Sequence, residues 1–232
     1  MNAARSVRAM VLAVMAILAG PAWGQSKNLA PGFTSLPTGA TIAIMPADIE
    51  LFSISGGGVL EPKADWTEAA SKYFRTALIE KKQKLGLRTV ELAEKDADDF
   101  AEINTLHAAV AGAIAMHHFG PLSLPTKEGK LDWSLSDAVG PVKKATGADY
   151  ALFSWVRDSY ASAERKAAMI GLAILGVGVA GGQQIGYASL VDLNTGQILW
   201  FNRLARGHGD LREPASAAET VEALLTEFPV SK

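Results

Sequence analysis

Residues 149–160 (DYALFSWVRDSY) carry the strongest strand pattern in the sequence. The first half is apolar at consecutive positions, which is typical of a strand buried on both faces in the middle of a sheet. Residues 184–192 and 197–205 read as two further strands. Asn194-Thr195-Gly196 between them has hairpin chemistry, because glycine adopts positive φ without strain.

The N-terminal half contains further candidate strands. Residues 41–46 (TIAIMP) form a short apolar, β-branched run that predicts a buried strand. Residues 48–53 extend this strand or form an edge, and Gly56-Gly57-Gly58 reads as a loop. Residues 87–92 (LRTVEL) alternate and predict a second strand.

Four helices are expected between and after these strands. Asp65-Trp66-Thr67-Glu68 is a capping-box pattern that opens the first helix, which ends at Leu85-Gly86. Its Lys72, Arg75 and the Glu80-Lys81-Lys82 cluster are expected to face solvent. Three further helices are expected: one with apolar residues from Phe100 to Ile114, one within 134–146 whose start Pro141 leaves open, and one from Ser216 with a capping box at Glu219.

The order of elements is therefore β-α-β-α-α-β, an insert, then β-β-α. This order predicts one α/β domain over residues 40–232, with a mixed sheet of about five strands and packed helices. Residues 25–39, with two prolines, read as an extended leader.

The insert, residues 162–183, is unusual in composition. Residues 167–185 (AAMIGLAILGVGVAGGQQI) carry no charge and contain five glycines. The run Gly176-Val-Gly178-Val-Ala-Gly181 matches a dinucleotide fingerprint. That fingerprint needs a strand before it, a helix after it and an acid about 20 residues further on. A strand follows here and Asp192 comes too early, so no cofactor is predicted.

Two interpretations of the insert stay open. A short helix (residues 162–175) could fold over the sheet as extra core, as long apolar runs usually do. Alternatively, the segment contacts a membrane or a partner protein, as large exposed apolar patches do. The candidate interaction residues in the insert are Ile170, Leu172, Ile174, Leu175, Val177 and Val179. Trp200 and Phe201 join them, because strand alternation puts the two on opposite faces and leaves one available for recognition.

Residues 1–24 read as a secretory signal peptide. Arg5 and Arg8 precede a ten-residue apolar run, and Ala22-Trp23-Gly24 places small residues at the cleavage site, so cleavage is expected after Gly24. The run is too short for a membrane span. A periplasmic location is therefore predicted. Attachment at the periphery of the outer membrane is the alternative within that compartment.

Composition excludes several classes of function. The chain has no cysteine, which excludes disulfide scaffolds, thiolate metal sites, cysteine nucleophiles and a lipid anchor at the cleavage site. A formal net charge of −2 gives no footprint for nucleic acid. With 49% hydrophobic and 20% charged residues, the chain has enough apolar side chains for a folded core.

The sequence predicts no catalytic, metal or cofactor site. His107 and His117 lie about 80° apart on one helix, and neither His118 nor His208 completes a metal-ligand spacing. Ser154 lies within a strand and not at a nucleophile elbow. Carboxylates at strand ends, Asp48 with Glu50 and Asp158 beside Arg157, are the weak remaining acid–base candidates.

Two pieces of the sequence resemble a known family. Gly147-Ala148-Asp149-Tyr150 entering a strand, and Val191-Asp192-Leu193-Asn194-Thr195-Gly196-Gln197-Ile198-Leu199-Trp200 across a hairpin, resemble the curli-secretion (CsgG-like) envelope proteins. That group includes activators of penicillin-binding proteins and exopolysaccharide-secretion lipoproteins. The resemblance implies a non-catalytic periplasmic module for assembly, scaffolding or secretion, with envelope proteins or copies of itself as partners. In the curli protein, inserted segments form membrane hairpins, but the insert here does not alternate like a porin strand.

The expected function is therefore contact with other envelope proteins, through the insert and the sheet edge. The alternatives are a periplasmic protein that binds a small molecule or polysaccharide, a hydrolase, and a pore-forming oligomer. A deep polar pocket near Asp158 or Asp48 would favour the binding protein, whereas a protruding insert would favour contact.

Overall fold

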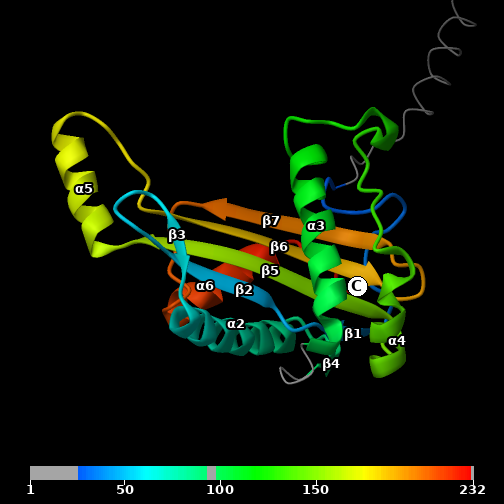
Figure 1. Cartoon of the computed structure of the whole chain (residues 1–232). Coiled ribbons are helices and arrows are strands. Elements are labelled where there is room, and N and C mark those ends of the chain that lie inside the picture. The colour runs from blue at the N-terminus through cyan, green and yellow to red at the C-terminus, as the bar shows by residue number, and fades with distance from the viewer. Residues whose placement is uncertain (1–25, 93–97, 231–232) are drawn as a thin grey trace, which may run out of the picture.

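The computed structural model describes residues 26–92 and 98–230, and it shows one mixed sheet with helices on both faces (Figure 1). This confirms the predicted α/β class. The expected signal peptide, residues 1–24, lies outside the described residues.

The strand predicted to be central is central. β5 (Tyr150–Ala161) pairs along its length with antiparallel β6 (Gly182–Asp192), from Tyr150 beside Asp192 to Tyr160 beside Gly182. β6 in turn pairs with antiparallel β7 (Ile198–Arg206). Gly196 in the connecting turn has φ 74°, as the hairpin chemistry predicts.

Two short strands share the other edge of β5, and both run parallel to it. These are β1 (Thr41–Ile44) and β2 (Asp48–Ile54). Ile44 lies beside Leu152 and Asp48 beside Trp155, so three residues, 45–47, lie opposite only two residues of β5. This extra residue is a bulge with Pro46 at its centre, and we call residues 45–47 the kink.

The outer edge is also divided in two. β4 (Arg88–Glu91) flanks β1 in parallel, and β3 (Leu60–Pro62) flanks β2 in antiparallel orientation. Within the described residues, seven strands therefore occupy five positions across the sheet, which matches the predicted width. β3 is an addition that the sequence patterns did not predict.

One face of the sheet is covered by α2 (Ala64–Lys84) and α6 (Pro214–Leu224) (Figure 1). The capping boxes predicted for both helices are wrong. α2 begins before Asp65, and Thr67 Oγ1 instead accepts a hydrogen bond from the Leu51 N–H at 2.9 Å. α6 begins at Pro214, because the fixed φ and missing N–H of proline suit a first turn.

Helices also cover part of the opposite face. They are η2 (Asp98–Phe100), α3 (Ala101–His117), η4 (Ser136–Val139) and α4 (Gly140–Thr146), whereas η3 (Pro125–Lys127), in the connection between α3 and η4, buries no residue. Pro141 lies in the first turn of α4, where it removes no helical hydrogen bond. Ile114 of α3 packs into the same core cluster as Phe153 of β5 and Phe201 of β7.

The leader predicted as extended packs against the edge of β7. Ala30 N–H donates to the Leu199 carbonyl at 2.9 Å, and Phe201 N–H donates to the Asn28 carbonyl at 2.9 Å. Leu36, further along, is buried. This part of the sheet edge is therefore covered by the chain itself, which protects it from pairing with other molecules.

Candidate functional site

The insert forms an arm that stands off one end of the sheet (Figure 1). It consists of α5 (Ala163–Ile174) and the irregular return to β6, and we call residues 163–180 the arm. The predicted helix is present, but none of its residues is buried. The interpretation as extra core is therefore wrong, because the helix is not folded over the sheet.

The candidate residues of the insert lie on the arm surface. Ile174 is 81% exposed, Leu175 76% and Ile170 67%. Leu172 and Val177 are also exposed, and Val179 is half-buried. Exposure at this level over consecutive turns is rare for large aliphatic side chains, which soluble proteins usually bury.

The arm has no polar face beyond its first turn. After Lys166, the 3.6-residue period places Ile170 and Ile174 on one side of α5 and Met169 and Leu172 on the other. A helix that is hydrophobic all round is normally surrounded by protein or lipid. Among the described residues, no helix is long and apolar enough to cross a membrane.

The base of the arm is tightly held. Ser162 Oγ caps α5 by accepting from the Arg165 N–H, and Ala161 N–H donates to the Gly181 carbonyl at 2.6 Å. A Cβ on Gly182 would lie 2.1 Å from the Ser159 carbonyl oxygen, so only glycine fits this close approach of β6 to β5. The arm therefore leaves the sheet from a fixed point.

A second exposed apolar element lies beside this base. The loop from β2 into the first residue of β3 carries Val59 (63% exposed) and Leu60 (54%). A Cβ on Gly56 in the same loop would lie 3.6 Å from Glu164 of α5. Of the ten exposed large hydrophobic residues in the described ranges, seven belong to the arm or to this loop. The sequence contains a signal for this surface, because two aliphatic residues, Val59-Leu60, directly follow three glycines. The glycines alone indicate only a loop.

Trp200 and Phe201 do not belong to this surface. They lie on opposite faces of β7 as predicted, but both side chains are fully buried. Trp200 packs edge-on against Phe228, and Phe201 stacks with Phe119 at 5.6 Å. Their prediction as interaction residues is wrong, because both faces of the sheet are covered at this point.

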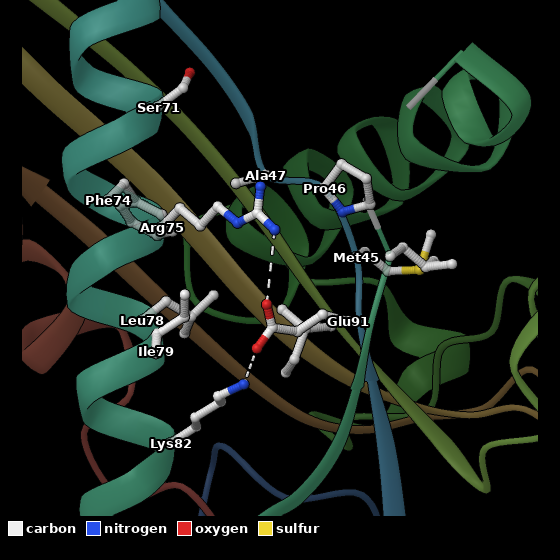
Figure 2. A pocket seen from close by; sticks show the side chains of 12 residues that line it. Met45, Pro46, Ala47, Ser71, Phe74, Arg75, Leu78, Ile79, Lys82 and Glu91 are labelled. Carbon is white, nitrogen blue, oxygen red and sulfur yellow. Dashed lines mark hydrogen bonds and ion pairs between the residues drawn. The ribbon is translucent and has the colours of Figure 1, made fainter. Parts of the chain in front are cut away.

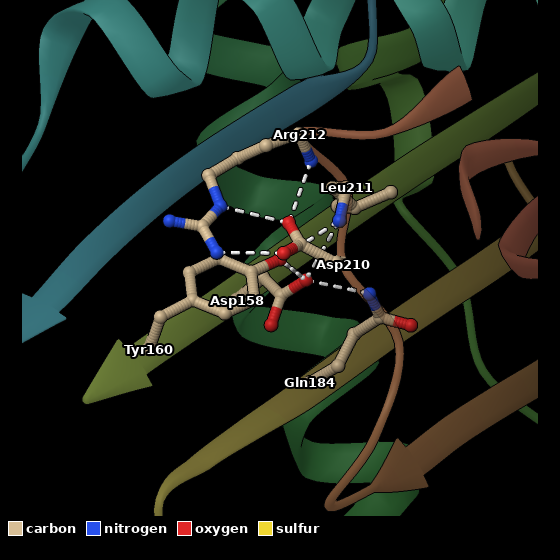
Figure 3. A network of polar contacts seen from close by, with 6 residues as sticks. All are labelled: Asp158, Tyr160, Gln184, Asp210, Leu211 and Arg212. Carbon is tan, nitrogen blue, oxygen red and sulfur yellow. Dashed lines mark hydrogen bonds and ion pairs between the residues drawn. The ribbon is translucent and has the colours of Figure 1, made fainter. Parts of the chain in front are cut away.

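A buried carboxyl lies at the end of β5 that leads to the arm (Figure 3). Asp158 is 2% exposed and accepts hydrogen bonds from the Tyr160 hydroxyl and from Gln184 Nε2 at 2.7 Å. Burial raises the pKa of Asp158, and burial together with the Asp158 carboxyl raises the pKa of Tyr160. Leu211 N–H donates to the Tyr160 hydroxyl oxygen at 2.8 Å.

The same network ties the C-terminal segment to the sheet. Arg212 forms a bidentate pair with Asp210, at 2.6 and 2.8 Å, and its guanidinium lies 4.0 Å from the Tyr160 ring and 4.5 Å from the Trp66 ring. Arg206 Nε donates to Gln184 Oε1 at 2.9 Å. These contacts connect β5, β6, β7 and α2. The network therefore stabilises the packing of these elements.

The polar cavity beside Asp158 is small. Its volume is about 80 Å³, between the ends of β5 and β6 and the Gly207-His208-Gly209 turn. An engineered cavity of about 150 Å³ holds one benzene ring, so this space is too small for a sugar ring. It is not the deep pocket that a polysaccharide-binding protein would need.

The second carboxylate pair is neutralised. Arg157 Nη1 lies 2.8 Å from Asp48 Oδ1, and Arg157 Nε lies 3.3 Å from Glu50 Oε2. The guanidinium also lies over the Trp155 ring, 4.6 Å from its centre. Ser154, which precedes Trp155 on β5, is buried. The pair therefore has neither a free acid nor an accessible nucleophile beside it.

Three of the histidines make contacts that hold the fold together. His107 is buried, stacks on Phe153 at 4.9 Å and lies 2.8 Å from Ser189 Oγ. Burial lowers the pKa of His107 to about 3. His117 and His118 bond backbone carbonyls, those of Leu122 and Lys27. Within residues 26–92 and 98–230, no three His, Asp or Glu side chains are grouped to hold a metal ion.

The glycine run resembling a dinucleotide fingerprint lies in the return of the arm. A helix precedes it and a strand follows it, which reverses the order that phosphate binding requires.

No protein-family model and no curated protein matches the chain. Solved structures are similar over most of its length. The PelC dodecamer from Paraburkholderia phytofirmans is 12% identical, with a TM-score of 0.40 and coverage of 86% of this chain and 94% of that one. The LpoB C-terminal domain from Salmonella enterica is 15% identical (TM-score 0.31; 76% and 87%). Lipoprotein GNA1162 from Neisseria meningitidis is 14% identical (TM-score 0.32; 82% and 97%).

These likenesses, at low identity and with TM-scores below 0.5, assign no role to any residue of this chain. Membership of the curli-secretion-like family therefore stays a prediction from the two sequence motifs.

Proposed function

We propose that this chain is a secreted, non-catalytic protein of the bacterial cell envelope that acts in assembly, scaffolding or secretion through contacts made by its arm. The observation that carries the proposal is the exposure of a helix that is uncharged and apolar on every side beyond its first turn. Covering such a helix releases ordered water from a large apolar surface, which is the main driving force of protein association.

The polar groups of the chain support a role without catalysis. The carboxylates that sequence patterns nominated for acid–base work are paired with Arg157 or enclosed by Tyr160 and Gln184. General acid–base catalysis needs a titrating group within reach of a bound substrate. The expected signal peptide supports a periplasmic location, where the partner is an envelope protein or a second copy of this chain.

Membrane contact is the second candidate, and a specific observation favours it. The only charges of the arm, Glu164, Arg165 and Lys166, lie in its first turn, so an apolar tip extends beyond a charged base. This distribution suits a segment that enters the interfacial region of a bilayer without spanning it.

Site-specific photo-crosslinking in intact bacterial cells tests the proposal. A photoreactive residue replaces Ile174 at the arm tip, or Lys144 as an exposed control on α4, which precedes the opposite end of β5 (Figure 1). We expect a discrete protein adduct from position 174 and none from position 144. Lipid adducts at position 174 alone would favour the membrane candidate. Equal labelling at both positions, or none at position 174, would contradict contact through the arm.

A further inference from the structure

The free side of the arm can be located from the contacts that its other side makes. Arg165 Nη2 donates to the Ala180 carbonyl at 3.4 Å, and a Cβ on Gly181 would lie 3.1 Å from Met169. This side of α5 therefore faces the return to β6. The helix period places five exposed residues on the opposite side, and we call them the stripe: Ala163, Ala167, Ile170, Gly171 and Ile174.

The exposed apolar surface around the stripe is large enough for a stable protein interface. The seven large aliphatic residues of the arm and the β2–β3 loop are each between 37% and 81% exposed. Their exposed fractions amount to about four whole side chains, on the order of 800 Å², and each partner of a standard-size interface contributes about this area. The largest apolar patch on a typical monomer is about 300–600 Å².

This surface has two parts, which lie at the two ends of α5. Ile174 and Leu175 lie at the tip, whereas the loop that carries Val59 and Leu60 lies beside the base. α5 is about 18 Å long, so the tip cannot cover the loop of its own molecule. A second α5 that lies antiparallel along the stripe brings its tip to this base. Each copy then covers both apolar parts of the other at once.

The charges and the bulk of the domain also favour an antiparallel pair. Glu164, Arg165 and Lys166, the charges of the arm, lie in its first turn, and the domain is attached at the same end (Figure 1). In a parallel pair, the two domains and the two charged turns would lie side by side. An antiparallel pair separates them by the length of the helix and places the positive end of each helix dipole near the negative end of the other.

A head-to-tail contact would need a different apolar surface to receive the arm. The cavity between α2 and the kink has a volume of about 170 Å³ (Figure 2). A cavity of about 150 Å³ holds one benzene-sized group, so there is no room for a helix face. Its lining also includes the paired Lys82 and Glu91, and Lys82, predicted to face solvent, keeps only 14% of its side chain exposed.

The other exposed large hydrophobic residues of the described ranges do not form a second receiving surface of this size. There are three of them, on α3 and the segment after it: Leu106, Met116 and Leu122. Within the described part of the chain, the surface that matches the arm is therefore the same surface on another molecule.

From this geometry we propose that the partner of the arm is a second copy of this chain, bound through antiparallel α5 helices. The stripes of the two copies pack against each other, and Ile174 and Leu175 of one copy cover Val59 and Leu60 of the other. An interface that uses the same patch on both molecules closes as a twofold dimer and does not grow into a fibre. This inference rests on the proposed function, because it names the partner of the same arm.

Sedimentation equilibrium of the purified chain tests for the dimer. We expect a monomer–dimer equilibrium with a Kd of about 1–10 µM. Ile174→Glu should weaken association at least tenfold, because it buries a carboxylate in an apolar contact. Met116→Glu, at a residue of α3 that is 51% exposed, should leave the Kd unchanged. Circular dichroism confirms that both variants are folded. A chain that is monomeric at 100 µM, or equal effects of the two substitutions, would overturn the proposal.

Cysteine cross-linking tests the antiparallel arrangement, because the chain has no cysteine of its own. A disulfide needs Cα atoms within about 7 Å of each other. Ala167→Cys, near the middle of α5, should oxidise to a linked dimer. Ile174→Cys should not, because the two tips lie more than about 15 Å apart along the helix axes, but it should pair with Ala163→Cys in a mixture of the two variants. Efficient linkage of Ile174→Cys to itself would refute the antiparallel pair.

Failure of the dimer and failure of contact through the arm give different results. A monomeric purified chain, together with an adduct to a different protein from position 174 in cells, would refute the second copy as partner and leave contact through the arm standing. A monomeric chain without any adduct at position 174 would refute both. An adduct of twice the chain mass in cells, with a dimer in solution, is the result that we expect.

Discussion

His107 shows how one buried side chain sets a physical property of the whole chain. It is 2% exposed, packed between Phe153 and Ser189, and its pKa lies at about 3 because burial disfavours the charged ring. In an unfolded chain the pKa of histidine is about 6.5. The unfolded state therefore binds more protons between these two values, and stability falls as the pH drops below about 6.5.

This gives a pH prediction for a single substitution. Between pH 7 and pH 5, protonation of unfolded His107 should lower the free energy of unfolding by about 2 kcal/mol. His107→Gln, which keeps a polar group near Ser189, should lose this part of the pH dependence even if it is less stable at pH 7. Urea denaturation at both pH values measures the difference. If the free energy of unfolding of the variant falls between pH 7 and pH 5 by as much as that of the parent, His107 does not titrate as described.

The helix spacing of His107 and His117 was visible in the sequence, but their surroundings were not. Both lie in α3, as predicted. Only the packing of α3 on β5 and β6 shows that His107 is enclosed while His117 bonds a backbone carbonyl. Burial of a polar residue depends on which helix face meets the sheet, and short-range patterns leave that open for a helix rich in alanine.

At the scale of elements, the base of the arm is a precise junction in a glycine-rich segment. The glycines of the segment are not equivalent. A Cβ on Gly182 would lie 2.1 Å from a backbone oxygen, whereas a Cβ on Gly178 would meet no atom within 4 Å. The sequence shows the same residue type at both positions, so the difference arises only from the approach of β6 to β5.

A matched pair of alanine substitutions tests this junction. Gly182→Ala should lower the free energy of unfolding by about 1–3 kcal/mol, because the backbone must move to admit the methyl group. Gly178→Ala should change it by less than about 0.5 kcal/mol. Chemical denaturation of both variants provides the values. Equal costs at the two positions would mean that β5 and β6 do not approach each other in this way.

The whole molecule follows the predicted order of elements, and the departures have identifiable causes. The hairpin at Gly196 and the central β5 were readable because turn chemistry and consecutive apolar residues are local signals. The kink at Pro46 was not readable in this way. A bulge is defined by how many residues of the neighbouring strand lie opposite it, and here that strand, β5, is more than 100 positions away in the sequence. The sequence also could not place the arm, because an apolar run suits the protein's own core and a partner's surface equally well.

If the arm serves contact and not folding, the domain should fold without it. Because the Ala161 N–H bonds the Gly181 carbonyl, a short glycine-serine linker can replace residues 163–180 without stretching the chain. The most direct measurement is the urea denaturation of this arm-deleted chain. We predict one cooperative transition, with a free energy of unfolding within about 1 kcal/mol of the full chain. Loss of the cooperative transition, or a decrease of several kcal/mol in the free energy of unfolding, would contradict the account. It would show that the arm is part of the folded core.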